Sequence, residues 1–321
     1  MENYKKGIDS LVYAVCGSGK TEISLKIIQY VINCGEKIAF AIPRKDVCIE
    51  LYSRLKDIFS KNKVIALYGG HTKEKYGDIV VLTTHQLFRF KKYFSLIILD
   101  EIDAFPFSGD PVLNSIFYNA LNGHYIMMSA TPSEEVINHF SEENKDILKL
   151  QTRFHRHPLP VPELVIGNTL FLFAILIKKM SSYLKEKKPI FVFAPTIKEC
   201  EKLFSFLSIF FRSGNYVHSK RKNRGEIIDA FRSSVYSFLV TTSVLERGVT
   251  VKNLQVIIFK SDSFVYEKGV LVQIAGRVGR KADAPEGEVI FLANKKTKEM
   301  ELAVSSIQRD NKALQDMLQR D

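Results

Sequence analysis

The sequence predicts an α/β protein of two tandem domains, each a mostly parallel sheet flanked by helices. The chain has 321 residues, which suits about two domains of roughly 150 residues each. Short apolar runs alternate with helical patterns in both halves. Residues 155–162 contain three prolines and two histidines and follow neither period, so they interrupt the alternation. We therefore expect domains at 1–152 and 166–321, joined by a linker at 153–165.

Six short apolar runs in the first half are expected to be strands. The runs are continuous rather than alternating, which is typical of parallel strands buried on both faces. Apolar residues from Ile23 to Val31 recur at helical spacing, so a helix is expected at 19–32. The expected strands are 11–15, 38–42, 64–67, 79–83, 96–99 and 125–128.

The second half repeats this order of elements. It begins with an expected helix at 170–185 and ends with a long expected helix at 296–319. The repeated alternation predicts a second parallel sheet. Its expected strands are 190–193, 216–218, 238–241, 256–259 and 288–292.

The composition excludes several classes of protein. Hydrophobic residues make up 46% and charged residues 25%, which excludes a disordered or collagen-like chain. The longest unbroken apolar run, 170–177, is far shorter than the ~20 residues of a membrane-spanning helix. No signal-peptide pattern follows Met1. We therefore expect a cytosolic protein.

The four cysteines are isolated. Cys16, Cys34, Cys48 and Cys200 form no C-x-x-C pair, so neither a zinc ribbon nor a disulfide framework is expected. We interpret all four as small buried side chains.

The charge balance favours a polyanionic partner. Lys and Arg number 46 against 35 Asp and Glu, giving a net charge of +11. Such an excess is typical of proteins that bind nucleic acid or an anionic membrane surface. A soluble protein that is basic for another reason is the alternative that the charge alone leaves open.

A phosphate-binding loop is expected at 14–21, Ala-Val-Cys-Gly-Ser-Gly-Lys-Thr. It follows an apolar strand and opens a helix, so its backbone amides and the helix N-terminus can bind the β- and γ-phosphates of ATP. The lysine can reach the phosphates, and the threonine hydroxyl can bind Mg²⁺. Ala14 replaces the usual glycine, but the G-x-G-K-T core is intact. The residues expected to bind ATP are Gly17, Ser18, Gly19, Lys20 and Thr21.

Adjacent carboxylates follow the apolar run at 96–99. Because parallel strands end at the same sheet edge, Asp100 and Glu101 are expected beside the phosphate-binding loop. Asp100 suits Mg²⁺, and Glu101 suits polarisation of the water that attacks the γ-phosphate.

A third group of candidate catalytic residues lies in the second half. Residues 273–280 read Gln-Ile-Ala-Gly-Arg-Val-Gly-Arg and are expected to form a short helix with Arg277 and Arg280 on one face. Two guanidinium groups there suit capture of the γ-phosphate, as an arginine finger does. Gln273 suits orientation of the water or the phosphate. The glycines at 276 and 279 indicate close packing rather than a solvated helix.

These three groups resemble the core of superfamily 2 helicases, which consists of two RecA-like domains. Further motifs occur in the family's order: Ile-Pro-Arg at 42–44, Thr-Thr-His-Gln-Leu at 83–87, Ser-Ala-Thr-Pro at 129–132, Phe-Ala-Pro-Thr at 193–196 and Thr-Thr-Ser-Val-Leu-Glu-Arg-Gly-Val at 241–249. The resemblance implies that Ser129 and Thr131 couple hydrolysis to strand binding. A helix N-cap at 129–133 is the alternative for them.

In such helicase cores, loops at strand ends contact the nucleic-acid backbone. Contacts to phosphates require no base identity, so little sequence specificity is expected. The alternative interpretation of the basic run at 220–224 is a solvated turn without a nucleic-acid contact. The alternative interpretation of His85 is an ordinary loop histidine. The candidate contacts are Arg44, Gly70, Thr84, His85, Thr196, His218, Lys220 and Thr242.

Within the superfamily the chain resembles the ComFA competence ATPases. The resemblance lies in the segments 99–107, 43–46, 242–250 and 273–288. It implies a cytosolic ATPase at the inner face of the cell membrane that helps to import single-stranded DNA during transformation, with a phosphoribosyltransferase-like competence protein as a partner. The family's N-terminal extension carries a four-cysteine zinc site, and no such cysteines precede the phosphate-binding loop here, so zinc is not expected.

Two other functions remain open at the level of sequence. One is a primosomal or DEAD-box-like helicase that unwinds duplex DNA or RNA, although the zinc insertion of the former and the upstream glutamine motif of the latter are not found. The other is a truncated, inactive binding module. The presence of the whole set of candidate catalytic residues favours an active ATPase.

Overall fold

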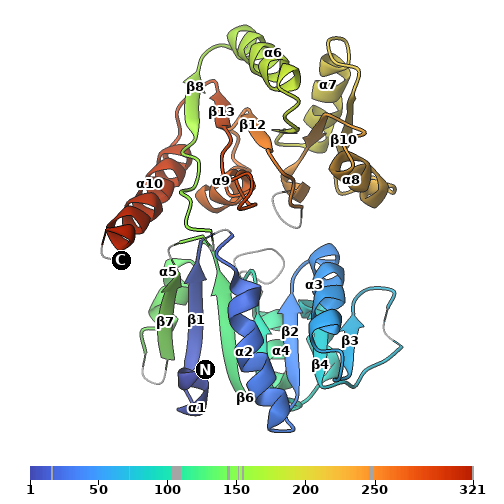
Figure 1. Ribbon diagram of the computed structural model, residues 1–321, viewed down its shortest axis with the longest axis vertical. Helices are drawn as coiled ribbons and strands as arrows, with labels where there is room; N and C mark the ends of the chain where they lie inside the picture. The colour runs from blue at the N-terminus through green and yellow to red at the C-terminus, as the bar shows by residue number, and fades with distance from the viewer. Residues whose placement is uncertain are drawn as a thin grey trace. The chain divides into compact units, whose positions relative to one another are not determined.

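The computed structural model describes residues 1–15, 17–71, 73–102, 110–142, 145–150, 152–153, 155–245 and 249–319. The chain divides into two compact units, Met1–Gln151 and Thr152–Asp321, shown in Figure 1. The first unit ends one residue before the end of the expected first domain. Each unit is built on its own sheet, and we describe each separately.

The first unit contains a seven-stranded sheet in the order β3-β4-β2-β5-β6-β1-β7. All neighbouring strands pair in parallel. The carboxyl ends of all seven strands therefore lie at one edge of the sheet. The strands are β1 (Asp9–Ala14), β2 (Ile38–Ile42), β3 (Val64–Leu67), β4 (Ile79–Thr83), β5 (Phe94–Leu99), β6 (Leu121–Ser129) and β7 (Lys145–Leu150).

Helices cover both faces of this sheet. On one face α2 (Lys20–Asn33) and α3 (Lys45–Ile58) pack apolar side chains onto the strands, and on the other face α4 (Pro111–Ala120) does so. Asp110 caps α4 by accepting from two amides of its first turn, and Pro111 occupies the first helical position, where its missing N–H costs nothing. The short elements are α1 (Glu2–Lys5), α5 (Glu134–His139) and the 3₁₀ helix η1 (Thr84–Arg89).

The second unit contains a six-stranded sheet in the order β10-β11-β9-β12-β13-β8. All its neighbouring strands also pair in parallel. Its carboxyl ends therefore share one edge as well. The strands are β8 (Glu163–Ile166), β9 (Ile190–Phe193), β10 (Gly214–Val217), β11 (Phe238–Thr241), β12 (Gln255–Phe259) and β13 (Val289–Ala293).

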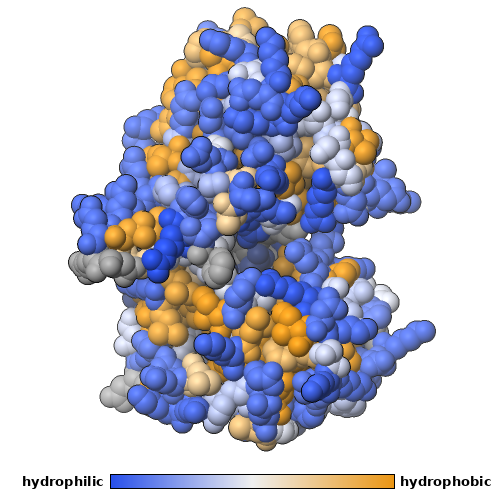
Figure 2. Space-filling view, in the orientation of Figure 1, coloured by the Kyte–Doolittle hydropathy of each residue, from blue (hydrophilic) through white to orange (hydrophobic). Residues whose placement is uncertain are grey.

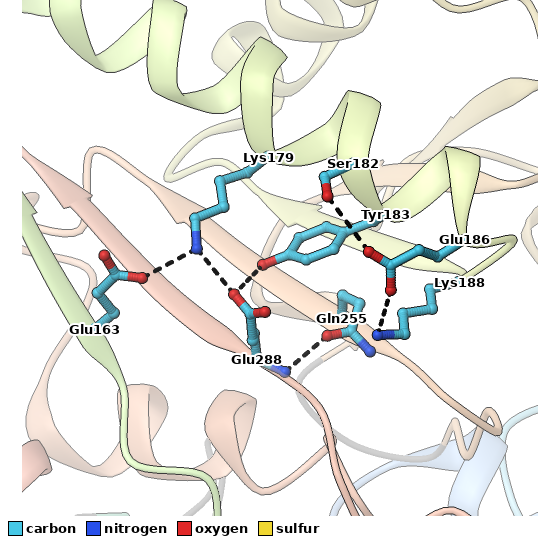
Figure 3. Close-up of polar contacts among 8 residues, drawn as sticks. All are labelled: Glu163, Lys179, Ser182, Tyr183, Glu186, Lys188, Gln255 and Glu288. Atoms are coloured by element: carbon cyan, nitrogen blue, oxygen red, sulfur yellow. Dashed lines mark hydrogen bonds and ion pairs between the residues drawn. The ribbon is translucent and has the colours of Figure 1, made fainter.

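A polar network anchors the first long helix of the second unit to its sheet (Figure 3). Glu288, directly before β13, accepts hydrogen bonds from Lys179 Nζ (2.9 Å) and Tyr183 Oη (2.8 Å). Lys179 also donates to Glu163 of β8 (3.2 Å). The helices of this unit are α6 (Thr169–Lys185), α7 (Ile197–Leu207), α8 (Arg224–Arg232), α9 (Lys268–Ala275), α10 (Lys298–Leu318) and the 3₁₀ helix η2 (Ser243–Leu245).

The expected fold class is confirmed: both units are parallel sheets flanked by helices. The segment at 153–165, expected as a linker, instead contributes to the second unit. Its last residues belong to β8, which pairs with β13, and the backbone of Leu159 exchanges two hydrogen bonds with the Asn311 side chain on α10. Prolines stop the segment from forming a helix, but they do not keep it from packing.

One expectation about the cysteines is wrong. Cys48 and Cys200 are buried as expected, but Cys34 is exposed. Cys34 follows the last residue of α2 as its C-cap, and a helix end at the surface leaves this side chain in solvent. Cys16 lies outside the described residues.

Hydrophilic side chains predominate on the face of each unit that Figure 2 shows, with smaller hydrophobic areas between them. Within the described part of the chain, every helix is too short or too polar to cross a membrane.

Candidate functional site

The expected phosphate-binding loop connects β1 to α2. Gly17 and Gly19 have φ angles of 84° and 81°, a left-handed conformation that glycine adopts without strain. Gly19 is the N-cap of α2, so the free amides and positive dipole end of the helix begin at Lys20. The Ser18 hydroxyl is buried and has no hydrogen-bond partner among the described residues. An unsatisfied buried group costs about 1–3 kcal/mol, and a phosphate oxygen would satisfy it.

The structure brings the loop lysine and the first carboxylate together. Lys20 Nζ lies 3.5 Å from Asp100 Oδ1, because β5 and β1 are separated by β6 alone and end at the same edge. Asp100 Oδ1 also accepts from the Glu101 amide (2.8 Å). Glu101 has a φ of 58°, a backbone conformation that costs a non-glycine residue of order 1–3 kcal/mol and that clusters at active sites.

The expected coupling residues follow β6, the strand between β5 and β1. Ser129 is its last residue and is fully buried. Its Oγ accepts from the backbone amide of Thr131 (2.9 Å), so the Ser129 side chain closes a tight turn after the strand. The N-cap of α5 is Ser133, so the segment 129–133 does contain a helix N-cap, although Ser129 and Thr131 are not the capping residues.

The residues at the loop suit Mg²⁺ bound together with nucleotide phosphates. Thr21 supplies a hydroxyl in the first turn of α2, and Asp100 supplies a carboxylate. Such oxygen ligands are typical of Mg²⁺, which usually binds one or two protein groups plus substrate phosphates. Among the described residues, no group of three or more His, Cys, Asp or Glu could hold a metal ion without a substrate.

The expected nucleic-acid contacts of the first unit form a second set of candidates. They lie at the same carboxyl edge of the sheet, after strands farther from β1. Arg44 follows β2, Gly70 follows β3, and Thr84 and His85 follow β4, and these three strands are neighbours. Gly70 and His85 are exposed, whereas Thr84 is fully buried and its hydroxyl has no partner among the residues described. The four candidates are thus separated from the phosphate-binding loop by β5 and β6.

Three residues at this second set were missed by the sequence reasoning. The Tyr68 and His71 rings stack with centroids 5.0 Å apart, across a turn closed by two backbone hydrogen bonds. Lys45 Nζ lies 5.1 Å from the centre of the Tyr68 ring and donates to the Gly69 carbonyl (3.1 Å). Their proximity to Arg44 and Gly70 in the sequence was the available signal.

The nucleic-acid candidates of the second unit also follow neighbouring strands. Thr196 follows β9, His218 and Lys220 follow β10, and Thr242 follows β11. Thr196 is exposed and caps α7 by accepting from the Glu199 amide (3.2 Å). Lys220 is exposed, and Thr242 is buried.

His218 differs from the other candidates in its packing. The whole residue is only 6% exposed, and its ring stacks on the ring of Tyr216. His218 Nε2 lies 3.2 Å from Glu201 Oε1, and its Nδ1 is buried without a partner among the described residues. The Arg221 guanidinium lies 3.9 Å from the centre of the Tyr216 ring. His218 is thus buried, whereas its neighbour Lys220 is exposed.

The two candidate arginines do not share a helix face, so that expectation is wrong. Helix α9 ends at Ala275 with Gly276 as its C-cap, and Gly279 has a φ of 63°, which ends the helical path. Gln273 is buried within α9. Arg277 and Arg280 lie in the turn that follows.

The environments of these two arginines differ. Arg277 is 4% exposed and donates from Nη1 to the Val249 carbonyl (2.9 Å). Arg280 is partly exposed and donates from Nη1 to Thr250 Oγ1 (3.3 Å). Arg277 thus bonds the last residue of the motif at 241–249, and Arg280 bonds the residue directly after it. Residues 246–248 of that motif, and 103–107 of the segment after Glu101, lie outside the described residues.

Two family models match the chain, one in each unit. Residues 1–140 match the model described as DEAD/DEAH box helicase, and residues 173–282 match the helicase conserved C-terminal domain.

The chain is also similar to competence proteins. It is 36% identical over 311 residues to the competence protein ComFA of Bacillus subtilis, covering 94% of this chain and 67% of that protein. It is 36% identical over 315 residues to ComFA of Streptococcus pneumoniae, covering 94% and 72%.

Among solved structures, the chain resembles S. cerevisiae Dbp5 bound to RNA and ADP BeF3, with a TM-score of 0.71, 16% identity and coverage of 95% of this chain and 83% of that one. It also resembles the Mycobacterium smegmatis helicase Lhr bound to ssDNA and AMP-PNP, with a TM-score of 0.70, 16% identity and coverage of 97% and 47%. At this level of identity, the two structures show the fold alone.

Proposed function

The chain belongs to the ComFA family of helicase superfamily 2 and is a nucleic-acid-dependent ATPase, and from this premise we propose that it moves along single-stranded DNA and drives its import during natural transformation. The observation that carries the proposal is the Lys20–Asp100 pair at 3.5 Å. A lysine that can reach the phosphates lies beside a carboxylate suited to Mg²⁺, and this pairing supports the hydrolysis of a nucleoside triphosphate.

The first unit supplies the groups that bind and activate ATP. The amides from Gly17 to Gly19 bind the β- and γ-phosphates, and the buried Ser18 hydroxyl gains the partner that it lacks among the described residues. Lys20 neutralises the phosphate charge. Thr21 and Asp100 hold Mg²⁺, which supplies further charge neutralisation when bound. Glu101 orients and polarises the attacking water.

The second unit supplies the arginines. The partly exposed Arg280 stabilises the negative charge that develops on the γ-phosphate, in the manner of an arginine finger. Arg277, which is buried, holds the turn against the Val249 carbonyl, and Gln273 orients the water or the phosphate. The assignment of these roles comes from the sequence pattern.

The nucleic-acid partner is proposed to be single-stranded DNA bound through its phosphates. Arg44, Gly70, Thr84 and His85 in the first unit, and the set around Lys220 in the second, follow strand ends that offer amides, hydroxyls and cations. Such contacts are insensitive to base identity, which suits a protein that must carry any sequence. ATP binding favours one conformation of the protein, and hydrolysis lets the protein return to the other. The affinity for the DNA strand therefore alternates between the two conformations. By family resemblance, a phosphoribosyltransferase-like competence protein is the proposed protein partner.

Hydrolysis of ATP by the purified chain tests this function. The rate is measured with single-stranded DNA, duplex DNA, RNA and no nucleic acid, at one stated salt concentration because binding to phosphates depends on salt. Strong stimulation by single-stranded DNA supports the proposal. Preferential stimulation by duplex DNA or RNA identifies a helicase of the primosomal or DEAD-box type instead, and a near-zero rate in every case identifies a binding module.

A further inference from the structure

A buried arginine at the start of the second unit holds the turn that carries Arg277 and Arg280. Arg153 is 1% exposed and is the largest of the fully buried side chains in the described part of the chain. Its Nη1 donates to the carbonyls of Val278 (2.9 Å) and Gly279 (2.6 Å), and its Nη2 donates to the carbonyl of Gly276 (3.2 Å). One guanidinium group therefore bonds three carbonyls within four residues.

The three carbonyls that Arg153 bonds belong to the C-cap of α9 and the turn after it, beyond the hydrogen-bond ladder of the helix. Buried backbone carbonyls of this kind require a hydrogen-bond partner. The planar guanidinium presents several donors in a fixed geometry, so it can bond a set of carbonyls that an ammonium group cannot match. Burial of a charge is costly unless the charge is hydrogen-bonded. If Arg153 only filled space, a long apolar side chain would do so without the free-energy cost of burying a charge. We therefore infer that the hydrogen bonds of Arg153 are themselves required.

The turn fits closely around Arg153. Gly279 has a positive φ, and a Cβ atom there would clash with the Pro285 carbonyl and would lie 3.0 Å from Arg153 Nη1. The backbone at Gly279 is thus packed closely against both the Pro285 carbonyl and the Arg153 guanidinium. Arg280 is the next residue after the Gly279 carbonyl that Arg153 bonds.

The position of Arg153 in the chain adds a connection to the first unit. The last residue of β7, Leu150, accepts at its carbonyl from the amide of Val15 (3.0 Å), near the start of the phosphate-binding loop. Arg153 is three residues further along the chain. In the sequence, Gln151 and Thr152 are the two residues between the end of β7 and Arg153.

From these observations we propose that Arg153 is a positioning residue for ATP hydrolysis: it fixes the turn at 276–280 and thereby sets the direction in which Arg280 points. The inference rests on the proposed function, in which Arg280 acts on ATP. Arg153 itself touches neither ATP nor the reacting atoms. Loss of its bonds should therefore impair the chemical step more than the binding of ATP or DNA.

The test compares Arg153→Met and Arg153→Lys with Arg156→Met, which replaces an exposed arginine three residues away. For Arg153→Met we expect kcat for ATP to fall about 10- to 100-fold, the size of effect that misplacement of a catalytic group by about 1 Å produces. KM for ATP and the affinity for DNA should stay within about twofold of wild type, since neither depends on where Arg280 points. Arg153→Lys retains the charge but not the forked bonds, so it should recover little, and Arg156→Met should match wild type.

A double-mutant cycle and hydrogen exchange separate this inference from the proposed function. In an Arg280→Ala background, Arg153→Met should cause no further loss, because it acts through Arg280. The amides of Arg277 and Val278, which bond Ile274 and Ala275, should exchange faster with deuterium in Arg153→Met. Wild-type kcat in both Arg153 variants, additive losses in the cycle, or unchanged exchange at 276–280 would overturn the inference and leave the ATPase assignment intact. An inactive wild-type chain would overturn the proposed function, and exchange would still decide whether Arg153 holds the turn.

Discussion

Lys20 Nζ lies 3.5 Å from Asp100 Oδ1, so the loop after β1 and the end of β5 form one ionic pair across the intervening strand β6. Both side chains are largely buried, at 18% and 14% exposed. Removal of either partner takes an opposite charge away from the other in a partly desolvated place, which is destabilising. Loss of either side chain should therefore lower both the stability of the site and its activity.

Replacement of the loop lysine should abolish turnover. In Lys20→Ala, ATP hydrolysis with saturating single-stranded DNA should fall by about 10²-fold or more, because the γ-phosphate loses its main charge partner. Steady-state phosphate release measures this. Lys26→Ala is the matched control, since Lys26 is an exposed residue of the same helix. Normal turnover in Lys20→Ala would contradict the assignment of the phosphate-binding loop.

The two arginines of the turn should separate stability from catalysis. Arg277 is buried and bonds the Val249 carbonyl, so Arg277→Ala should lower both the melting temperature and kcat. The lost buried hydrogen bond of a charged group is worth about 1.5–3 kcal/mol. Arg280 is partly exposed, so Arg280→Ala should lower kcat with little change in melting temperature. Thermal unfolding and ATPase rates measured on both variants give the comparison, and equal melting temperatures would show that the burial of Arg277 has no energetic role.

Local patterns made most of the fold and the phosphate-binding loop predictable. The loop needs a strand, two glycines and a helix start within a few residues, and all of these are adjacent in the sequence. The edge strands β7 and β8 were not expected, because Lys145–Leu150 and Glu163–Ile166 mix polar with apolar residues and their pairing depends on distant strands. Periodicity does not report such non-local pairing.

The details of the arginine turn were also beyond the sequence. The three-residue spacing of Arg277 and Arg280 fits a helix, but the helix ends at Ala275, and the residue that holds the turn, Arg153, lies more than a hundred residues earlier in the chain. A contact of that kind follows from tertiary packing and leaves no local signal. The contact of His218 with Glu201 on α7, which its position at the end of the expected strand 216–218 did not indicate, has the same origin.

Acid should weaken the anchor between α6 and its sheet. The hydrogen bond that Lys179 donates holds the pKa of Glu288 below its ordinary value of 4.5. A carboxyl whose pKa is lowered by folding contributes stability above its ordinary pKa, and that contribution is lost as the pH falls through the lowered pKa. Wild type should therefore be more stable than Lys179→Met at neutral pH, and the difference should shrink as the pH falls below 4.5.

Urea unfolding of the two proteins over this pH range measures the effect. Lys178→Met is the control, because Lys178 is the exposed neighbour of Lys179 on α6. The difference at neutral pH should be small, since about half of the Glu288 side chain is exposed and solvent screens such pairs. A difference that stays constant with pH would mean that Lys179 stabilises the unit by packing rather than through the Glu288 carboxylate.

The two nucleic-acid candidates after β10 should affect DNA binding in different ways. Lys220 should contact a phosphate directly, and His218 should stabilise the structure around it. Lys220 is exposed and is proposed to bind a phosphate, so Lys220→Ala should reduce the slope of log K against log salt by about 0.7 for single-stranded DNA. His218 is buried against Tyr216 and Glu201, so His218→Ala should lower the melting temperature and weaken DNA binding without changing that slope.

Lys185→Ala is the control, because Lys185 is exposed and precedes β9, at the amino edge of the sheet. Fluorescence anisotropy with labelled DNA at several salt concentrations gives the slopes. An unchanged slope in Lys220→Ala would remove Lys220 from the interface, and a reduced slope in His218→Ala would show that the histidine itself contacts the DNA phosphates.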